Sequence, residues 1–229
     1  DTNSRLCMSS AVAGYKRTLG ADAPPACYAD LQHADTVFIV GSNMAYAHPI
    51  LFRRLEDAKR ARPQMKIIVA DPRRTETAEL ADLYLPLLPG TDEALFHGML
   101  HTMLWEGLTD PDYIAAHTRG FDALKARVRD FTPKETARLC GIDEDALVQA
   151  AQWFGATDHA SLSLYCQGLN QSTAGTAKNA ALINLHLATG KIGKLGCGPF
   201  SLTAQPNAMG GREVGGLASL LSGHRALAN

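Results

Sequence analysis

Two short apolar runs constrain the fold of this chain more than any other feature. Residues 36–40 read Thr-Val-Phe-Ile-Val, and residues 66–70 read Lys-Ile-Ile-Val-Ala. Continuous apolar runs without alternation are typical of strands that are buried on both faces of a parallel sheet. Between them, residues 49–62 carry apolar side chains at helical spacing, and Pro63 ends the stretch. The order strand, helix, strand predicts a βαβ unit.

The same alternation continues along the chain. It predicts an α/β fold with a doubly wound, mostly parallel sheet of the Rossmann-like type. We expect further strands at 83–85 and 160–165. We expect helices at 7–19, 28–34, 75–81, 93–106 with Asp92 as its cap, at several places within 110–155, and at 173–188.

Composition excludes several classes of protein. The net charge of -1 gives no reason to expect a nucleic-acid or anionic-membrane partner. No apolar run approaches the roughly 20 residues that a membrane-spanning helix needs. The five cysteines are scattered and form no CxxC pair, which argues against a disulfide framework and a zinc site and favours a reducing, cytoplasmic compartment.

Polar residues and glycines follow the strands at their carboxyl ends, where an open α/β sheet binds its ligands. Each residue alone is typical of a turn or a cap, but together they predict a nucleotide site. An aspartate after the second strand can bind ribose hydroxyls or a purine amino group, and arginine can bind a pyrophosphate. Neither GxGxxG nor GxxxxGK[ST] is present. The candidates are Asn43, Asp71, Arg73, Gly90, Thr91, Asp92, Gln167 and Gln171.

Cys7 stands at the start of the first expected helix. A thiolate at a helix N-terminus is stabilised by the helix dipole and free N–H groups, so Cys7 can be a nucleophile, a redox thiol or a metal ligand. A buried, inert cysteine is the alternative. His97 and His101 have the i, i+4 spacing of a metal pair, but no HExxH motif is present and we expect structural histidines. His48, before Pro49, is expected to be a cap or loop contact near the nucleotide edge.

Residues 205–216 are unusually rich in glycine, with four glycines among residues 210–216. Such a stretch makes a poor helix or strand and allows a backbone to approach a ligand closely. Gln205 and Arg212 lie among these glycines. We therefore expect a loop of the functional site and not an ordinary linker.

Taken together, these stretches resemble the molybdopterin oxidoreductases that carry molybdenum on two molybdopterin guanine dinucleotides. The resemblance covers essentially the whole chain and implies the formate dehydrogenase/DMSO reductase type of domain. It implies that Cys7 supplies the thiolate ligand of molybdenum. Asn43 and His48 fall in the family run G-x-N-x-x-x-x-H-P, residues 71–73 match its D-P-R, and residues 90–92 match its next nucleotide loop. Gln171 and Gln205 fall at positions that contact the pterin or its nucleotide.

Within that family, Cys7-Met8 and the stretch 205–216 resemble nitrate reductases, most of all the assimilatory, cytoplasmic kind. Nitrate reductases place a methionine and an arginine at the bottom of the substrate funnel, and Met8 and Arg212 match them. The planar fork of Arg212 suits a planar anion. Formate dehydrogenases carry cysteine or selenocysteine followed by histidine, and an arginine near the position of Thr203.

The resemblance implies molybdenum-dependent reduction of nitrate to nitrite by oxygen-atom transfer. The electron donor would be NADH through a flavin subunit, ferredoxin or flavodoxin. We expect the chain to be a piece of a longer enzyme, inactive alone, with a [4Fe-4S] cluster in a segment before Asp1. Residues 1–200 would form the cofactor-binding domain, and 201–229 would begin the following segment. A formate dehydrogenase or other family member, and a nucleotide-binding module without redox chemistry, are the alternatives.

Overall fold

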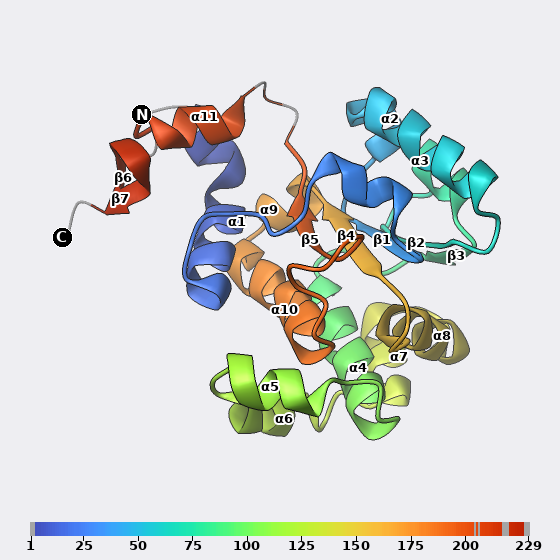
Figure 1. The fold of residues 1–229 in the computed structure, drawn as a ribbon. Coiled ribbons are helices and arrows are strands. Elements are labelled where there is room, and N and C mark those ends of the chain that lie inside the picture. The colour runs from blue at the N-terminus through green and yellow to red at the C-terminus, as the bar shows by residue number, and fades with distance from the viewer. Residues whose placement is uncertain (1–2, 204, 206, 217–219, 227–229) are drawn as a thin grey trace.

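The computed structural model describes residues 3–203, 205, 207–216 and 220–226. Its centre is a five-stranded sheet in the order β3-β2-β1-β4-β5, and every neighbouring pair is parallel (Figure 1). The strands are β1 (Thr36–Val40), β2 (Lys66–Ala70), β3 (Leu83–Leu85), β4 (Ser161–Tyr165) and β5 (Gly198–Ser201). The doubly wound sheet predicted from the apolar runs is confirmed.

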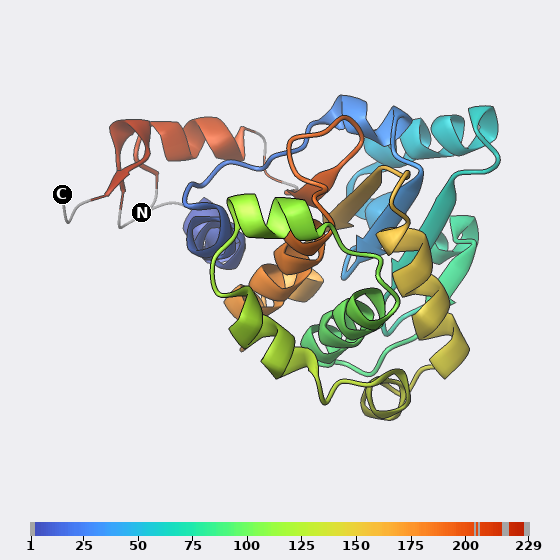
Figure 2. The ribbon, with the colours of Figure 1, turned by 60° about the horizontal axis from the view of Figure 1, so that its bottom comes forward.

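Both faces of the sheet are buried. Every residue of β1 is buried, with Phe38 and Val40 in one apolar cluster and Val37 and Ile39 in the other. The first cluster packs under α1 (Asn3–Leu19), α4 (Asp92–Trp105), α8 (Glu144–Gly155) and α10 (Gly175–Ala188). The second packs under η1 (Tyr28–Gln32), α2 (Met44–Ala47), α3 (Pro49–Ala61) and η2 (Glu76–Leu80). The two helical layers are separated by the sheet (Figure 2).

The helical block expected within 110–155 is confirmed. It contains α5 (Pro111–His117), α6 (Phe121–Val128), α7 (Pro133–Cys140) and α8. Three of these helices have side-chain caps at the N-terminus, because Asp110, Thr132 and Asp143 accept hydrogen bonds from backbone N–H groups three residues on. No helix among the described residues is both long enough and apolar enough to cross a bilayer.

Two helix starts differ from the sequence prediction. The helix α1 begins at Asn3, so Cys7 is its fifth residue and not its first. The helix α4 begins at Asp92 with Thr91 as its N-cap residue, because the Asp92 carboxylate is engaged by a lysine of α10. Short helical turns also follow β1 and β4, namely α2 and α9 (Gln167–Asn170).

The expectation of a loop over the glycine-rich stretch was wrong. Residues Ala208–Glu213 form a helix, α11, which follows Asn207 in the left-handed conformation with φ of 54°. Glycine serves packing here, since a Cβ on Gly210 would lie 2.4 Å from Oδ1 of Asn207. After α11 come β6 (Leu220–Leu221), η3 (Ser222–His224) and β7 (Arg225–Ala226), which lie to one side of the sheet in both views (Figures 1 and 2).

Candidate functional site

The backbones that follow β1 and β4 touch at the carboxyl edge of the sheet. Gly41 has φ of +57°, and the N–H of Gly168 donates to its carbonyl oxygen at 3.0 Å. A Cβ on Gly168 would lie 2.5 Å from the Cα of Gly41, so only glycine fits. The strand order reverses between β1 and β4, and in doubly wound folds the ligand crevice opens at such a switch point.

Cys7 reaches this edge from α1. Its Sγ accepts a hydrogen bond from Nε2 of Gln167 at 2.8 Å, and Gln167 is the first residue of α9, directly after β4. As the fifth residue of α1, Cys7 lies beyond the four N–H groups that a helix leaves free, which corrects the expectation that those groups stabilise its thiolate. The polar contact of the Cys7 sulfur is with Gln167, and Cys7 as a whole is partly buried.

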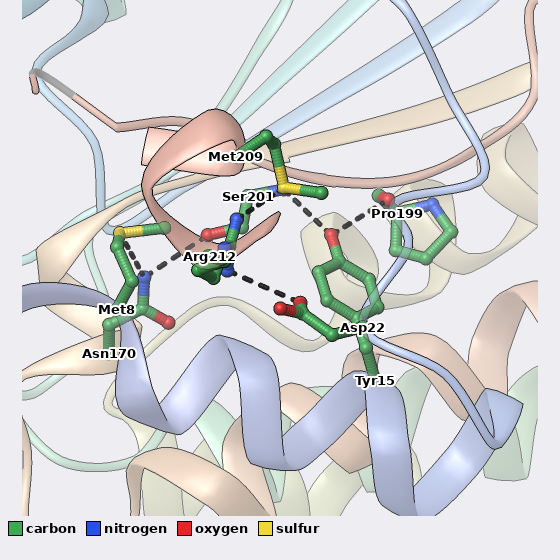
Figure 3. A network of polar contacts seen from close by, with 8 residues as sticks. All are labelled: Met8, Tyr15, Asp22, Asn170, Pro199, Ser201, Met209 and Arg212. Carbon is green, nitrogen blue, oxygen red and sulfur yellow. Dashed lines mark hydrogen bonds and ion pairs between the residues drawn. The ribbon is translucent and has the colours of Figure 1, made fainter. Parts of the chain in front are cut away.

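Met8 is buried in the core and does not face an open pocket. Its side chain is 1% exposed, and Nδ2 of Asn170 lies 4.0 Å from its sulfur. The same amide donates to Oγ of Ser201 at 3.2 Å (Figure 3). Asn170 itself accepts from Asn179 at 3.0 Å. Met8 is therefore held by a buried amide network between α1, α9, α10 and β5.

Arg212 of α11 is bound by Asp22, a residue that the sequence placed in a turn (Figure 3). Its Nη1 lies 3.2 Å from Oδ1 of Asp22, its Nη2 lies 2.6 Å from Sδ of Met209, and its Nε has no hydrogen-bond partner among the described residues. Arg212 is 3% and Asp22 5% exposed. The guanidinium expected to be open to an anion is thus largely neutralised by a buried carboxylate. Nothing in the local sequence around Asp22 signals this pairing across 190 residues.

Tyr15 fixes α1 against β5 beside this ion pair. Its hydroxyl donates to the carbonyl of Pro199 at 3.1 Å and accepts the N–H of Ser201 at 2.9 Å (Figure 3). Burial raises the pKa of Tyr15 to about 12, so the phenol stays protonated and keeps donating at any physiological pH. The helix that carries Cys7 is thereby fixed to the edge strand of the sheet.

A cavity of about 510 Å³ opens beyond the carboxyl end of β5. His48, Gln205 and Arg212 line it, together with Met209 and Ser201. Neither ring nitrogen of His48 has a hydrogen-bond partner among the described residues. The cavity thus brings together unpaired polar atoms of His48 and Arg212, which lie far apart in the chain, with Gln205 beside them.

The residues expected at the nucleotide edge lie at the ends of β1, β2 and β3. Oδ1 of Asn43 accepts from Oγ1 of Thr77 at 2.9 Å. Oδ1 of Asp71 accepts the N–H of Arg73 at 2.9 Å, and partial burial raises the pKa of Asp71. The Arg73 side chain is exposed. These contacts orient a carboxylate and an amide at the edge and leave a guanidinium free to bind phosphate.

The loop after β3 continues this edge. Gly90 is exposed with φ of +90°, and Oγ1 of Thr91 donates to the carbonyl of Leu88 at 2.7 Å. Asp92 points inward instead, where its carboxylate lies 2.6 Å from Nζ of Lys178, and both side chains are buried. Gln171, at the end of α9, is exposed. Lys178 was missed, because a lysine in an alanine-rich helix gives no sign of burial.

The described residues suit a large polar ligand with many hydrogen-bonding groups. Besides His48, the buried hydroxyl of Ser42 at the end of β1 lacks a partner among the described residues. The close contact of Gly41 and Gly168 brings two backbones together at the switch point without an intervening side chain of their own. In the described part of the chain, no three His, Cys, Asp or Glu side chains gather to hold a metal.

The fold is a doubly wound domain with polar side chains and a cysteine sulfur at the carboxyl edge of its sheet. The family model of the molybdopterin oxidoreductases matches residues 1–228. The chain belongs to the molybdopterin oxidoreductase family.

Its relatives include nitrate reductases and formate dehydrogenases. The chain is 49% identical to a nitrate reductase of Synechocystis sp., over all of this chain and 32% of the relative. It is 42% identical to a periplasmic nitrate reductase of Desulfovibrio desulfuricans, over 100% of this chain and 32% of the relative. An F420-dependent formate dehydrogenase alpha subunit of Methanococcus maripaludis is 38% identical over 99% of this chain and 33% of the relative. The chain spans about a third of the length of these curated relatives.

Among solved structures, the acetylene hydratase of Pelobacter acetylenicus has a similar fold. The TM-score is 0.72 at 27% identity, over 81% of this chain and 25% of that one.

Proposed function

We propose that this chain is the cofactor-binding part of a molybdenum-dependent nitrate reductase, which reduces nitrate to nitrite with two electrons and two protons and releases water. The observation that carries the proposal is the sulfur of the partly buried Cys7, held at the switch point by the Gln167 amide at 2.8 Å. The identity to nitrate reductases exceeds that to the formate dehydrogenase, 49% and 42% against 38%.

Cys7 would ligate the metal, and the remaining ligands would be dithiolene sulfurs of two molybdopterin guanine dinucleotides. When bound, this group supplies the two-electron oxygen-atom chemistry, and the protein supplies ligation, orientation and charge. Gln167 donates to the Cys7 sulfur and would orient it toward the metal, as outer partners of metal ligands do. A soft thiolate suits a transition metal with sulfur ligands.

The nucleotide ends would lie along the carboxyl edge. Asn43, Asp71 and Arg73 would bind one guanine dinucleotide, together with Gly90 and Thr91, whereas Asp92 is engaged by Lys178. The exposed Arg73 guanidinium provides charge for a pyrophosphate, and the half-buried Asp71 carboxylate an acceptor for ribose or guanine. Gln171, His48 and Gln205 would contact the pterin or its nucleotide.

Arg212 would bind and orient nitrate at the 510 Å³ cavity, with the Met8 side chain shaping the core behind it. Asp22 holds the guanidinium and offsets its charge, so the pair presents a fixed dipole and not a full cation. Such a pair orients a monovalent anion without binding it too tightly for release of the product. We expect Arg212→Lys to raise KM for nitrate, because lysine lacks the planar fork.

The ligand assignment is tested by Cys7→Ala in the full-length enzyme, with Cys27→Ala, an exposed cysteine, as the matched control. We expect Cys7→Ala to lose nitrate reduction by several orders of magnitude while Cys27→Ala retains it. Molybdenum content measured on the same samples separates loss of the metal from loss of turnover. Near-native nitrate reduction by Cys7→Ala would show that the assignment is wrong.

Two alternatives are separated by simple measurements. Formate oxidation that does not require nitrate, in an enzyme that fails to reduce nitrate, would identify a formate dehydrogenase. Absence of molybdenum from the purified full-length protein would identify a nucleotide-binding module without redox chemistry.

The wider enzyme is also part of the proposal. We expect a [4Fe-4S] cluster in the segment before Asp1, visible by electron paramagnetic resonance after reduction, and electrons from NADH through a flavin subunit, ferredoxin or flavodoxin. The assimilatory type implies the cytoplasm, which the scattered cysteines favour, whereas one relative is periplasmic. Recovery of the enzyme in the periplasmic fraction would contradict this location.

A further inference from the structure

A second and larger cavity lies away from the carboxyl edge, among the helices that cover one face of the sheet. Its volume is about 860 Å³, and it is bounded by the last turn of α1, by α4 and α10, and by the α5–α6 segment. We propose that this cavity binds a small organic phosphate. The ionisable residues of its wall are Arg17, Glu93, His97, His117, Arg119 and Arg127.

The charge of the wall is strongly positive. Three arginines face one carboxylate, that of Glu93, across this cavity. None of the three guanidinium groups forms an ion pair with another described residue, whereas other arginines of the chain, such as Arg62 and Arg138, are paired. Arg127 lies over the ring of Phe131, 5.6 Å from its centroid, which holds the guanidinium in place. Planar guanidinium groups of this kind bind phosphate through two parallel hydrogen bonds.

An unpaired buried histidine is the second, independent observation. His97 is 6% exposed and lines the cavity, and its Nδ1 has no hydrogen-bond partner among the described residues. Its ring packs edge-on against Phe131 at 4.9 Å, so the orientation is fixed. Burial lowers the pKa of His97, which keeps the imidazole neutral. A buried polar atom without a partner is rare in a folded protein, and here it belongs to an imidazole ring that forms part of the cavity wall.

The other residues that line the cavity indicate which kind of anion it can bind. Ala177, Ala180 and Ala181 of α10, with Leu19 and Leu187, form an apolar part, and Asn184 adds one amide. The cavity is much larger than one phosphate ion requires. A ligand that combines a phosphate with a compact organic body would use the arginines and the apolar wall together.

This site does not depend on the proposed nitrate chemistry. Cys7 and Gln167 meet at the first turns of α1 and the end of β4, whereas Arg17 lies in the last turn of the same helix. The test therefore reads binding and not turnover. It uses the full-length enzyme loaded with its cofactor, so that phosphate-binding groups of the carboxyl edge are already engaged.

Isothermal titration with inorganic pyrophosphate is the direct measurement. We expect saturable binding that Arg127→Gln and Arg119→Gln each weaken by about tenfold, as loss of one charged hydrogen bond implies. Arg54→Gln, an exposed arginine of α3 outside this cavity, is the matched control and should bind as the parent does. Binding should also weaken as salt is raised.

His97→Phe keeps the ring packing and removes the polar imidazole from the cavity wall, and it should weaken binding as well. If that variant fails to fold, the exposed arginine variants decide alone. No saturable binding at millimolar pyrophosphate, as expected if an acidic segment of the remaining enzyme fills the cavity, would overturn the proposal. Equal weakening by Arg54→Gln and Arg127→Gln would overturn it too.

Discussion

Replacement of Lys178 by methionine tests the buried ion pair that joins α4 to α10. Nζ of Lys178 lies 2.6 Å from Oδ2 of Asp92, with side chains 4% and 8% exposed. At an effective dielectric constant of about 20, two unit charges at that distance attract by about 6 kcal/mol. Desolvation of both groups offsets much of this, but Lys178→Met leaves the carboxylate buried without its partner. We expect a loss of about 3–5 kcal/mol in the free energy of unfolding.

The assay is urea unfolding of the 229-residue chain at pH 7, followed by circular dichroism. The double variant Asp92→Asn with Lys178→Met removes both charges and should recover most of the loss, because neutral groups cost less to bury. Arg60→Met is the control, since Arg60 pairs with Asp57 on the surface at 2.7 Å and its loss should be hard to measure. A loss of less than about 1 kcal/mol for Lys178→Met, or no recovery in the double variant, would refute the reasoning.

Two further predictions concern the switch point and the core. Gly168→Ala should lose about 1–3 kcal/mol of unfolding free energy, because its Cβ would meet the backbone of Gly41 at 2.5 Å, whereas Gly211→Ala, a helical glycine with open space, should be neutral or slightly stabilising. Equal urea midpoints for the two variants would contradict the close contact. His186 is fully buried, its Nε2 lies 2.7 Å from Oγ of Ser163, and burial lowers its pKa from 6.5 to about 3. As the pH falls below 6.5, His186 of the unfolded chain takes up a proton while His186 of the folded chain remains neutral. The free energy of unfolding is therefore highest above pH 6.5, as far as His186 is concerned, and decreases as the pH drops toward 3. In His186→Gln, the urea midpoint should depend less on pH between 6.5 and 3 than it does in the parent chain. An unchanged dependence would show that other groups cause the loss of stability at acid pH.

The strands were predictable where burial on both faces leaves a continuous apolar run. β1 and β2 match the expected residues, because a parallel strand between two helical layers tolerates few polar side chains. β5 was missed, since Gly198 and Pro199 are poor strand residues and only its pairing with β4 defines it. α11 was missed because its glycines oppose a helix, and packing against Asn207 and Asp22 overrides that propensity.

For the candidate site, the sequence predicted only which residues follow the strands and therefore lie at the same edge of the sheet. Segments that follow parallel strands must meet at one edge, so Asn43, Asp71 and Gln167 could be grouped from the sequence. Which partner each side chain meets could not be derived. Asp22 and Lys178 are bound by residues far away in the chain, and only the folded arrangement shows that they are buried.

The hydrogen bond between Cys7 and Gln167 closes a loop of 160 residues. Bringing such distant groups together costs chain entropy that local structure cannot offset, so the contact forms only when the sheet between them is complete. While the chain is being synthesised, there is a stage at which α1 is complete but β4 and α9 are not. At that stage Cys7 lacks the amide donor of Gln167. We therefore expect the metal to bind only after the chain has been synthesised and folded, and not while the chain is being synthesised.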